Sequence, residues 1–179
     1  MLDTTPTVAD IIRMTDKISA QLFKDEGHVC PVYVAFLADG DTHAVNLNEG
    51  FKNDYTKDRI NLILRIASKA CFKEKQIGGV LVTEGYMATL PRYVRHLDLA
   101  DVKRHYDKFG PASKLPGRVE AILYMAEART PTGVQRALGS RPIDEVTRAL
   151  GDLKIMEQKF TEKDIGEGFR QIGYGILGD

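Results

Sequence analysis

The sequence has little cysteine and no cysteine pair of the kind that binds zinc. Its two cysteines, Cys30 and Cys71, lie far apart, and no Cys-x-x-Cys occurs. Structural zinc sites built on thiolates use closely spaced ligands, so none is predicted. The first residues also lack the basic stretch and apolar core that would indicate an export signal. We therefore expect a cytoplasmic protein with two reduced thiols and no bound metal.

Long apolar runs and net charge are absent as well. No stretch approaches about 20 apolar residues, so no transmembrane helix is predicted. Basic and acidic residues number 25 each, which gives a formal charge of zero. The overall charge therefore gives no reason to expect binding to nucleic acid or to an anionic membrane. A chain of 179 residues, 43% of them hydrophobic, is typical of one globular domain.

Standard catalytic and nucleotide-binding motifs are missing too. The segment Gly166-Glu167-Gly168 begins like a dinucleotide-binding loop, but Gln171 replaces the third glycine that such a loop requires. The sequence has no Gly-Lys-Ser/Thr of a phosphate-binding loop, no Gly-x-Ser-x-Gly and no His-Glu-x-x-His. These absences predict a chain without a cofactor.

The first half of the chain carries clear signals for regular structure. Thr7 and Asp10 form a capping box ahead of apolar residues at helical spacing, and Gly27 is placed to end that helix. Asp39-Gly40 predicts a two-residue turn between two strands over 30–48, with Val34 opposite Val45. A second helix is predicted over about 57–73, because its apolar residues form one stripe.

Two apolar runs, residues 80–87 and 118–127, predict the third and fourth strands. After Gly133, Pro142 suits the first turn of a helix, and apolar residues follow at intervals of three and four up to Met156. The sequence thus predicts an α+β domain over 1–133 and a helical segment over 134–179 packed on it. The domain has a mainly antiparallel four-stranded sheet, in the order β-β-α-β-β, behind an N-terminal helix.

Three charged residues in these two predicted strands form the only constellation that could carry chemistry. Glu84 lies in one strand, and Arg118 and Glu120 share a face of the other, because side chains alternate along a strand. If the strands are neighbours, one guanidinium could bridge both carboxylates. Such a pair could perform acid and base catalysis, or it could be a structural ion-pair network, which we consider the better interpretation.

The segment between these strands, residues 91–118, is the one basic stretch of the chain. Its arginines and lysines outnumber its aspartates and are interleaved with aromatic residues. Arginine and tyrosine are frequent at protein interfaces, and basic residues with aromatics also suit a nucleic acid backbone and its bases. The candidate binding residues are Arg92, Tyr93, Arg95, Arg104, Tyr106 and Lys108.

The two ends of this segment also carry a resemblance. A strand that ends in Glu84-Gly85-Tyr86-Met87, and a next strand that opens with Pro116-Gly117-Arg118-Val119-Glu120, resemble small uncharacterised proteins of bacteria and their phages. In that group a glutamate and a large aromatic residue end one strand, and a Pro-x-Arg-x-Glu motif starts the next. The resemblance implies that Glu84, Arg118 and Glu120 form one structural or binding unit, and it implies no activity.

Taken together, the sequence predicts a non-catalytic protein that binds another protein or a second copy of itself, in assembly or regulation. The binding surface would be the basic segment 91–118 and the C-terminal helix. One alternative is a hydrolase-like enzyme that uses Glu84, Glu120 and Arg118. A second alternative is nucleic acid binding through residues 91–118.

Overall fold

The structure is a computed structural model, and it describes residues 5–48, 54–72, 75–87, 108, 112–158 and 176–177. Its main elements are α1 (Val8–Glu26), β1 (Val32–Leu37), β2 (Thr42–Asn46), α2 (Asp54–Ala67), β3 (Gln76–Met87), β4 (Val119–Thr130), β5 (Gly133–Pro142) and β6 (Lys154–Gln158). A π-helical turn, Ser68–Phe72, extends α2, and a short 3-10 helix, Ala112–Lys114, precedes β4.

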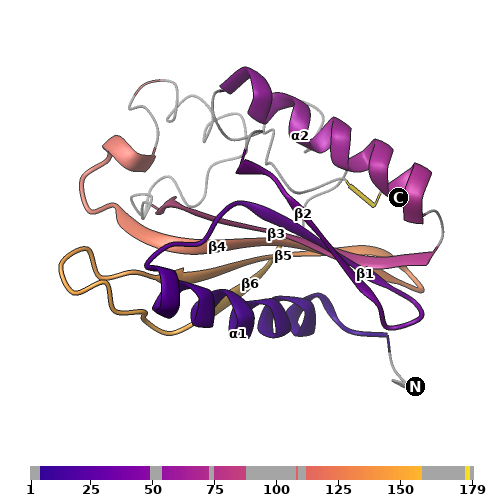
Figure 1. Cartoon of the computed structure of the whole chain (residues 1–179), viewed down its shortest axis with the longest axis horizontal. Helices are drawn as coiled ribbons and strands as arrows, with labels where there is room; N and C mark the ends of the chain where they lie inside the picture. The colour runs from indigo at the N-terminus through magenta and orange to yellow at the C-terminus, as the bar shows by residue number, and fades with distance from the viewer. Residues whose placement is uncertain are drawn as a thin grey trace.

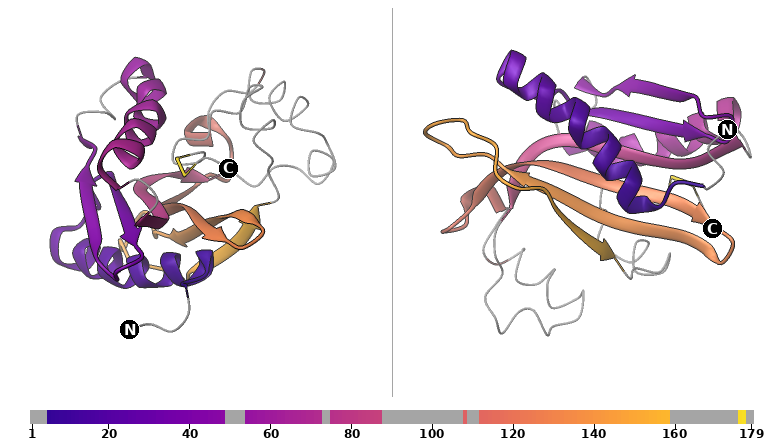
Figure 2. Two further views of the ribbon diagram at one scale, coloured as in Figure 1. Left: turned by 90° about the vertical axis from the view of Figure 1, so that its right-hand side faces the viewer. Right: turned by 90° about the horizontal axis from the view of Figure 1, so that it is seen from below.

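The strands form one antiparallel sheet in the order β2-β1-β3-β4-β5-β6. The two helices lie on opposite faces of this sheet, with α1 below it and α2 above it in Figure 1, and the two further views in Figure 2 show the same layers. The chain is therefore a single α+β domain, and the predicted antiparallel sheet is confirmed. The sheet has six strands, however, where the sequence predicted four.

The additional strands arise where the sequence predicted C-terminal helices. Thr130 pairs with Gly133 across a tight turn, so the chain reverses direction directly after β4. The next strand, β5, then pairs with β4 over the whole length of β5. Pro142 is the last residue of β5, not the start of a helix. Val146, predicted on the packing face of that helix, is 91% exposed at a loop. The predicted C-terminal helix is therefore wrong, and the part of residues 134–179 that the structure describes contains no helix.

Helix α1 is built as its sequence predicts. The Thr7 side chain accepts from the backbone N–H of Asp10, and the Asp10 side chain accepts from the backbone N–H of Thr7. The Thr7 hydroxyl also donates to the Asp10 carboxylate, and this bond, together with the one from the Thr7 N–H, lowers the pKa of Asp10. Gly27 ends the helix with φ +77°, in the left-handed region that favours glycine. The confirmed caps fix both ends of α1, and the second end leads directly to the candidate site.

The hairpin of β1 and β2 is confirmed, but its predicted register is wrong by one residue. Val34 lies opposite Ala44, whereas a two-residue turn would have placed it opposite Val45. The N–H of Leu37 donates to the carbonyl of Asp41, so the loop contains three residues. Gly40, with φ +92°, closes it in the manner of a three-residue hairpin loop.

Two hydrophobic cores, one on each face, hold the layers together. The core beneath α1 includes Ile11, Ile12, Val80, Val82, Ile122 and Tyr124. The core beneath α2 includes Tyr33, Ala35, Ile60, Leu64, Leu81 and Ile176. Burial on both faces explains why β3 reads as a nearly continuous apolar run. Among the described helices, none is long and apolar enough to cross a membrane.

A buried ion pair ties α1 to β5 within the first core. Asp16 is 4% exposed and lies against Arg141, whose Nε donates to Asp16 Oδ1 over 2.8 Å. The Tyr124 hydroxyl donates to the same oxygen over 2.8 Å. Burial beside this carboxylate raises the pKa of Tyr124, and the hydrogen bond to Asp16 raises the pKa of Arg141. The Asp16 carboxylate therefore joins α1 to both β4 and β5.

We predict that Asp16→Ala lowers the free energy of unfolding by about 3 kcal/mol, because it leaves Arg141 and the Tyr124 hydroxyl without their acceptor. Tyr124→Phe removes one hydrogen bond and should cost about 1 kcal/mol. Urea denaturation of both variants measures the difference. Equal costs would show that the ion pair contributes no more than the hydroxyl contact.

Candidate functional site

Glu84 and Glu120 lie on neighbouring strands at one end of the sheet. In the β3–β4 ladder Glu84 pairs with Ile122, and Tyr86 pairs with Glu120. Paired residues share a face, so both glutamates point to the side that α1 covers. The two strands are neighbours, which is the condition under which one guanidinium could bridge the two carboxylates.

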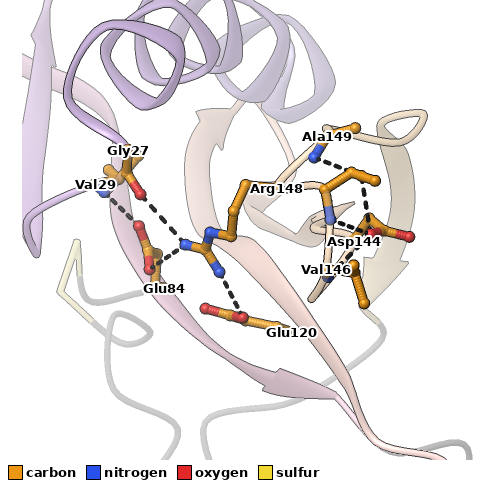
Figure 3. Close-up of polar contacts among 9 residues, drawn as sticks. Gly27, Val29, Glu84, Glu120, Asp144, Val146, Arg148 and Ala149 are labelled. Atoms are coloured by element: carbon orange, nitrogen blue, oxygen red, sulfur yellow. Dashed lines mark hydrogen bonds and ion pairs between the residues drawn. The ribbon is translucent and has the colours of Figure 1, made fainter.

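The guanidinium between the two carboxylates belongs to Arg148, not to Arg118. Arg148 Nη1 donates to Glu120 Oε2 over 2.7 Å, and Arg148 Nη2 lies 3.9 Å from Glu84 Oε2 (Figure 3). Nη2 also donates to the carbonyl of Gly27, the residue that ends α1. The backbone N–H of Val29 donates to Glu84 Oε1. We call Gly27, Val29, Glu84, Glu120 and Arg148 the Arg148 cluster.

Arg148 reaches the cluster from the loop between β5 and β6 because that loop is internally bonded. Asp144 Oδ1 accepts from the backbone N–H groups of Val146 and Thr147 and from the Thr147 hydroxyl. The N–H of Arg148 donates to the carbonyl of Asp144. Arg148 has φ +55°, a left-handed conformation that is unusual for arginine and that points to a constrained position.

The electrostatics of the cluster favour the ionised arginine. The hydrogen bond to Glu120 raises the pKa of Arg148. The guanidinium carbon also lies 5.0 Å from the centroid of the Phe23 ring on α1, a cation–π distance. The side chain remains 40% exposed, so water screens these interactions. The contacts of Arg148 and Glu84 therefore connect the end of α1 to β3, β4 and the β5–β6 loop.

Arg118 takes a different position from the predicted one. Its guanidinium lies over the Tyr86 ring, 5.5 Å from the centroid, and the side chain is exposed. The prediction that Arg118 bridges the carboxylates is therefore wrong. Arg118 precedes β4, and its guanidinium stacks on the Tyr86 ring of β3. The signal for Arg148 was weak: the Asp144-x-x-Thr147 spacing suits a loop cap, but this segment also has the periodicity of a helix.

An open pocket of about 450 Å³ adjoins the Arg148 cluster. Its walls come from the start of β4 and the β5–β6 loop, and they combine apolar and charged groups. The lining residues are Arg118, Val119, Glu120, Pro142, Ile143, Asp144, Glu145, Ala149, Leu150 and Gly151. Within the described part of the chain, no group of three His, Cys, Asp or Glu residues is placed to hold a metal ion.

Most of the predicted basic binding segment lies outside the described residues. This applies to Arg92, Tyr93, Arg95, Arg104 and Tyr106. Lys108 is described and is exposed. Of this segment the structure therefore describes Lys108 and residues 112–118, and Arg118 lines the pocket.

Comparison with known proteins adds no family. No protein-family model, no curated protein and no solved structure matches the chain. The interpretation of the site therefore depends on its geometry alone.

We predict that Arg148→Ala lowers the free energy of unfolding by about 1–2 kcal/mol, because it leaves two glutamates without their cation. This is below the cost of breaking a fully buried pair, since the cluster is partly solvated. Arg118→Ala is the matched control, and its exposed side chain should cost less than about 1 kcal/mol. Thermal and urea unfolding compare the two; a greater loss for Arg118→Ala would contradict the assignment of Arg148.

The loop should also loosen in acid. The backbone N–H of Thr147 and the other donors to Asp144 hold the pKa of that carboxyl below its ordinary value of 3.8. Because the pKa of Asp144 is lower in the folded state, its ionised carboxylate stabilises the folded loop at pH values above the unfolded-state pKa. This stabilisation is lost as the pH falls through the folded-state pKa. We expect the amide resonances of Val146 and Thr147 to titrate together, with a midpoint below 3.8. A midpoint at or above 3.8 would contradict the bonded loop.

Proposed function

We propose that the chain is a non-catalytic protein-binding protein that acts in assembly or regulation, and that it binds through the end of the sheet around the Arg148 cluster. The partner is another protein or a second copy of this chain. The observation that carries the proposal is a group of exposed interface-type residues at this end: Tyr86, Arg118 and Val146. We call these three residues the end surface.

The composition of the end surface supports recognition of a protein. Tyr86 is 41% exposed, and Arg118 stacks on its ring. Val146 is 91% exposed in the β5–β6 loop, other residues of which line the pocket. Tyrosine and arginine are enriched among residues that dominate binding energy, and exposed apolar side chains supply buried area on association.

The Arg148 cluster supports this surface rather than a reaction. Glu84 accepts from Val29, Glu120 accepts from Arg148, and the guanidinium separates the two carboxylates. A catalytic pair that shares a proton requires the carboxyl groups to face each other, as in the aspartic proteases. The cluster instead connects the β5–β6 loop to β4 and to the end of α1, so that the loop that carries Val146 is already ordered before a partner binds.

The test compares two substitutions of exposed apolar residues. Val146→Asp places a charge on the end surface, and Ile18→Asp places one on α1, where Ile18 is 65% exposed. We expect Val146→Asp to weaken binding about tenfold or more, and Ile18→Asp to change it less than about twofold. Both variants should unfold at nearly the wild-type temperature, because neither side chain is buried.

Binding is measured in two ways. Size-exclusion chromatography with light scattering over a concentration series detects self-association. Affinity capture from lysate, quantified for the wild type and both variants, detects a partner that depends on Val146. A monomer at every concentration, with no protein that the wild type enriches over Val146→Asp, would overturn the proposal.

One observation favours a second candidate, a hydrolase-like enzyme: Glu120 and Arg118 line the same pocket, with space for a small substrate. Here Glu120 would act as the base, and Arg118 would bind an anionic group. A panel of ester, phosphate ester and glycoside substrates tests this candidate. Activity that is present in the wild type and lost in Glu84→Gln, Glu120→Gln would favour it over the binding protein.

A further inference from the structure

Strand β2 forms one border of the sheet and leaves one side of its backbone open. Within the described residues its only strand partner is β1, and the right-hand view of Figure 2 shows β2 at the outer border of the sheet. The N–H of Leu37 donates to the carbonyl of Asp41, and the N–H of Leu47 donates to the carbonyl of Pro31. Backbone groups point alternately to the two sides of a strand, so the odd-numbered residues of β2 bond to β1 and the even-numbered residues point their N–H and C=O groups outward. The outward residues are Thr42, Ala44 and Asn46.

The sequence of β2 lacks the features by which natural sheets prevent edge-to-edge association. Such edges usually contain a proline, a bulge or charged residues, lysine above all. The strand reads Thr-His-Ala-Val-Asn, without proline, lysine, arginine or a carboxylate, and its ladder with β1 has no register shift. The opposite border, β6, instead carries the exposed Lys154. An edge that is open and regular in this way is suited to pairing with another strand.

Helix α2, on the same side of the sheet, exposes aliphatic residues to solvent. Its Ile60 and Leu64 are buried in the core, but three further aliphatic residues are each more than half exposed. These residues are Leu62, Ile63 and Ile66. The left-hand view of Figure 2 shows α2 over the β1–β2 side of the sheet, and the Phe72 ring, just after α2, lies 5.2 Å from the His43 ring of β2. A helix that is apolar on the side away from its core as well is typical of an interaction site.

We propose that the chain forms a two-fold dimer in which β2 pairs antiparallel with β2 of a second copy and the aliphatic faces of the two α2 helices lie together over the joined strands. A pairing centred on Ala44 gives every outward residue a partner: Ala44 lies opposite Ala44, and Thr42 lies opposite Asn46. These residues are uncharged, so the pairing brings no like charges together.

A second copy is the occupant that fits both features at once. A two-fold axis perpendicular to the sheet at Ala44 joins the two sheets edge to edge and places both α2 helices on the same face of the joined sheet. The copy therefore supplies an open strand edge and an aliphatic helix face in the same relation in which it presents them. The proposal uses a different surface from the end surface and does not depend on it.

The first test measures the oligomeric state of the full chain by sedimentation velocity over a concentration series. We expect a dimer for the wild type. Ala44→Pro removes an outward N–H and leaves the bonds to β1 in place, so it should raise the dissociation constant about tenfold or more. Ala44→Thr is the matched control, because it keeps the N–H and threonine suits a strand; it should change the constant less than about threefold.

A pair of charge variants tests the register. In Thr42→Lys, Asn46→Lys the proposed pairing sets lysine opposite lysine, whereas in Thr42→Glu, Asn46→Lys it sets glutamate opposite lysine. We expect the first variant to dissociate at about tenfold higher concentration than the second, because like charges directly opposite destabilise a strand pair. Positions 42 and 46 lie about 13 Å apart along one strand, so the two side chains of a monomer do not pair with each other.

The exposed face of α2 gives the third comparison. Ile63→Asp should raise the dissociation constant about tenfold, and Ile18→Asp, an equally apolar and exposed position on α1, should change it less than about twofold. Equal effects of the two substitutions would show that the α2 faces do not meet, and would overturn the proposal.

The other outcomes are also decisive. A wild type that is monomeric at every concentration, or two charge variants that dimerise equally well, would show that β2 does not pair as proposed. A dimer that Val146→Asp dissociates and Ala44→Pro does not would assign self-association to the end surface and would overturn this proposal alone. If circular dichroism shows that Ala44→Pro is unfolded, the charge variants decide, because their side chains replace exposed ones.

Discussion

The register between β3 and β4 is the constraint on which the rest of the structure depends. It places Glu84 opposite Ile122 and Tyr86 opposite Glu120, so that both glutamates face α1. The same ladder sends Tyr124 toward Asp16 and Glu127 toward the opposite core. A shift of β4 by one residue would move Glu120, Tyr124 and Glu127 to the other face while Glu84 stayed on the α1 face, and would separate the two glutamates. The two apolar cores therefore fix the positions of the charges.

The charges of β4 and α1 are in turn neutralised from one part of the chain. Arg136 and Arg141 on β5, and Arg148 in the following loop, bind Glu127, Asp16 and Glu120 respectively. Arg136 and Arg141 have opposite parity in β5, so they serve opposite faces of the sheet. These three arginines are the reason that Glu127 and Glu120 of the sheet, and Asp16 of the helix that covers it, can remain charged there.

The pairing of charged residues that are far apart in the chain explains how much of the fold and of the site the sequence could predict. Thr7, Asp10 and Gly27 set the ends of α1 as predicted, and the two carboxylate-bearing runs are strands as predicted. Asp39-Gly40 located the hairpin, but the register that it implied was wrong by one residue. The segment after Gly133 was predicted as a helix, because Ile143, Leu150 and Met156 recur at helical intervals. In the structure Ile143 and Leu150 form an isolated bridge with each other and Met156 pairs with Leu138 of β5, so pairing between distant residues determines their conformation. Local spacing cannot reveal that pairing, so Arg148 was not identified as the bridging arginine, and Arg118 was chosen instead.

The way in which the charged side chains at this end of the sheet are paired also bears on function. A catalytic site requires ionisable groups that are free to change partners during a reaction, whereas Glu84 and Glu120 each bind groups from another part of the chain. Arg148 joins Glu120 to the end of α1, so a proton or ligand that displaced it would also release the helix and the loop. The residues left exposed at this end are those suited to contact with another protein, Tyr86, Arg118 and Val146. These ion pairs are the reason that we propose binding, and not catalysis, for this end of the molecule.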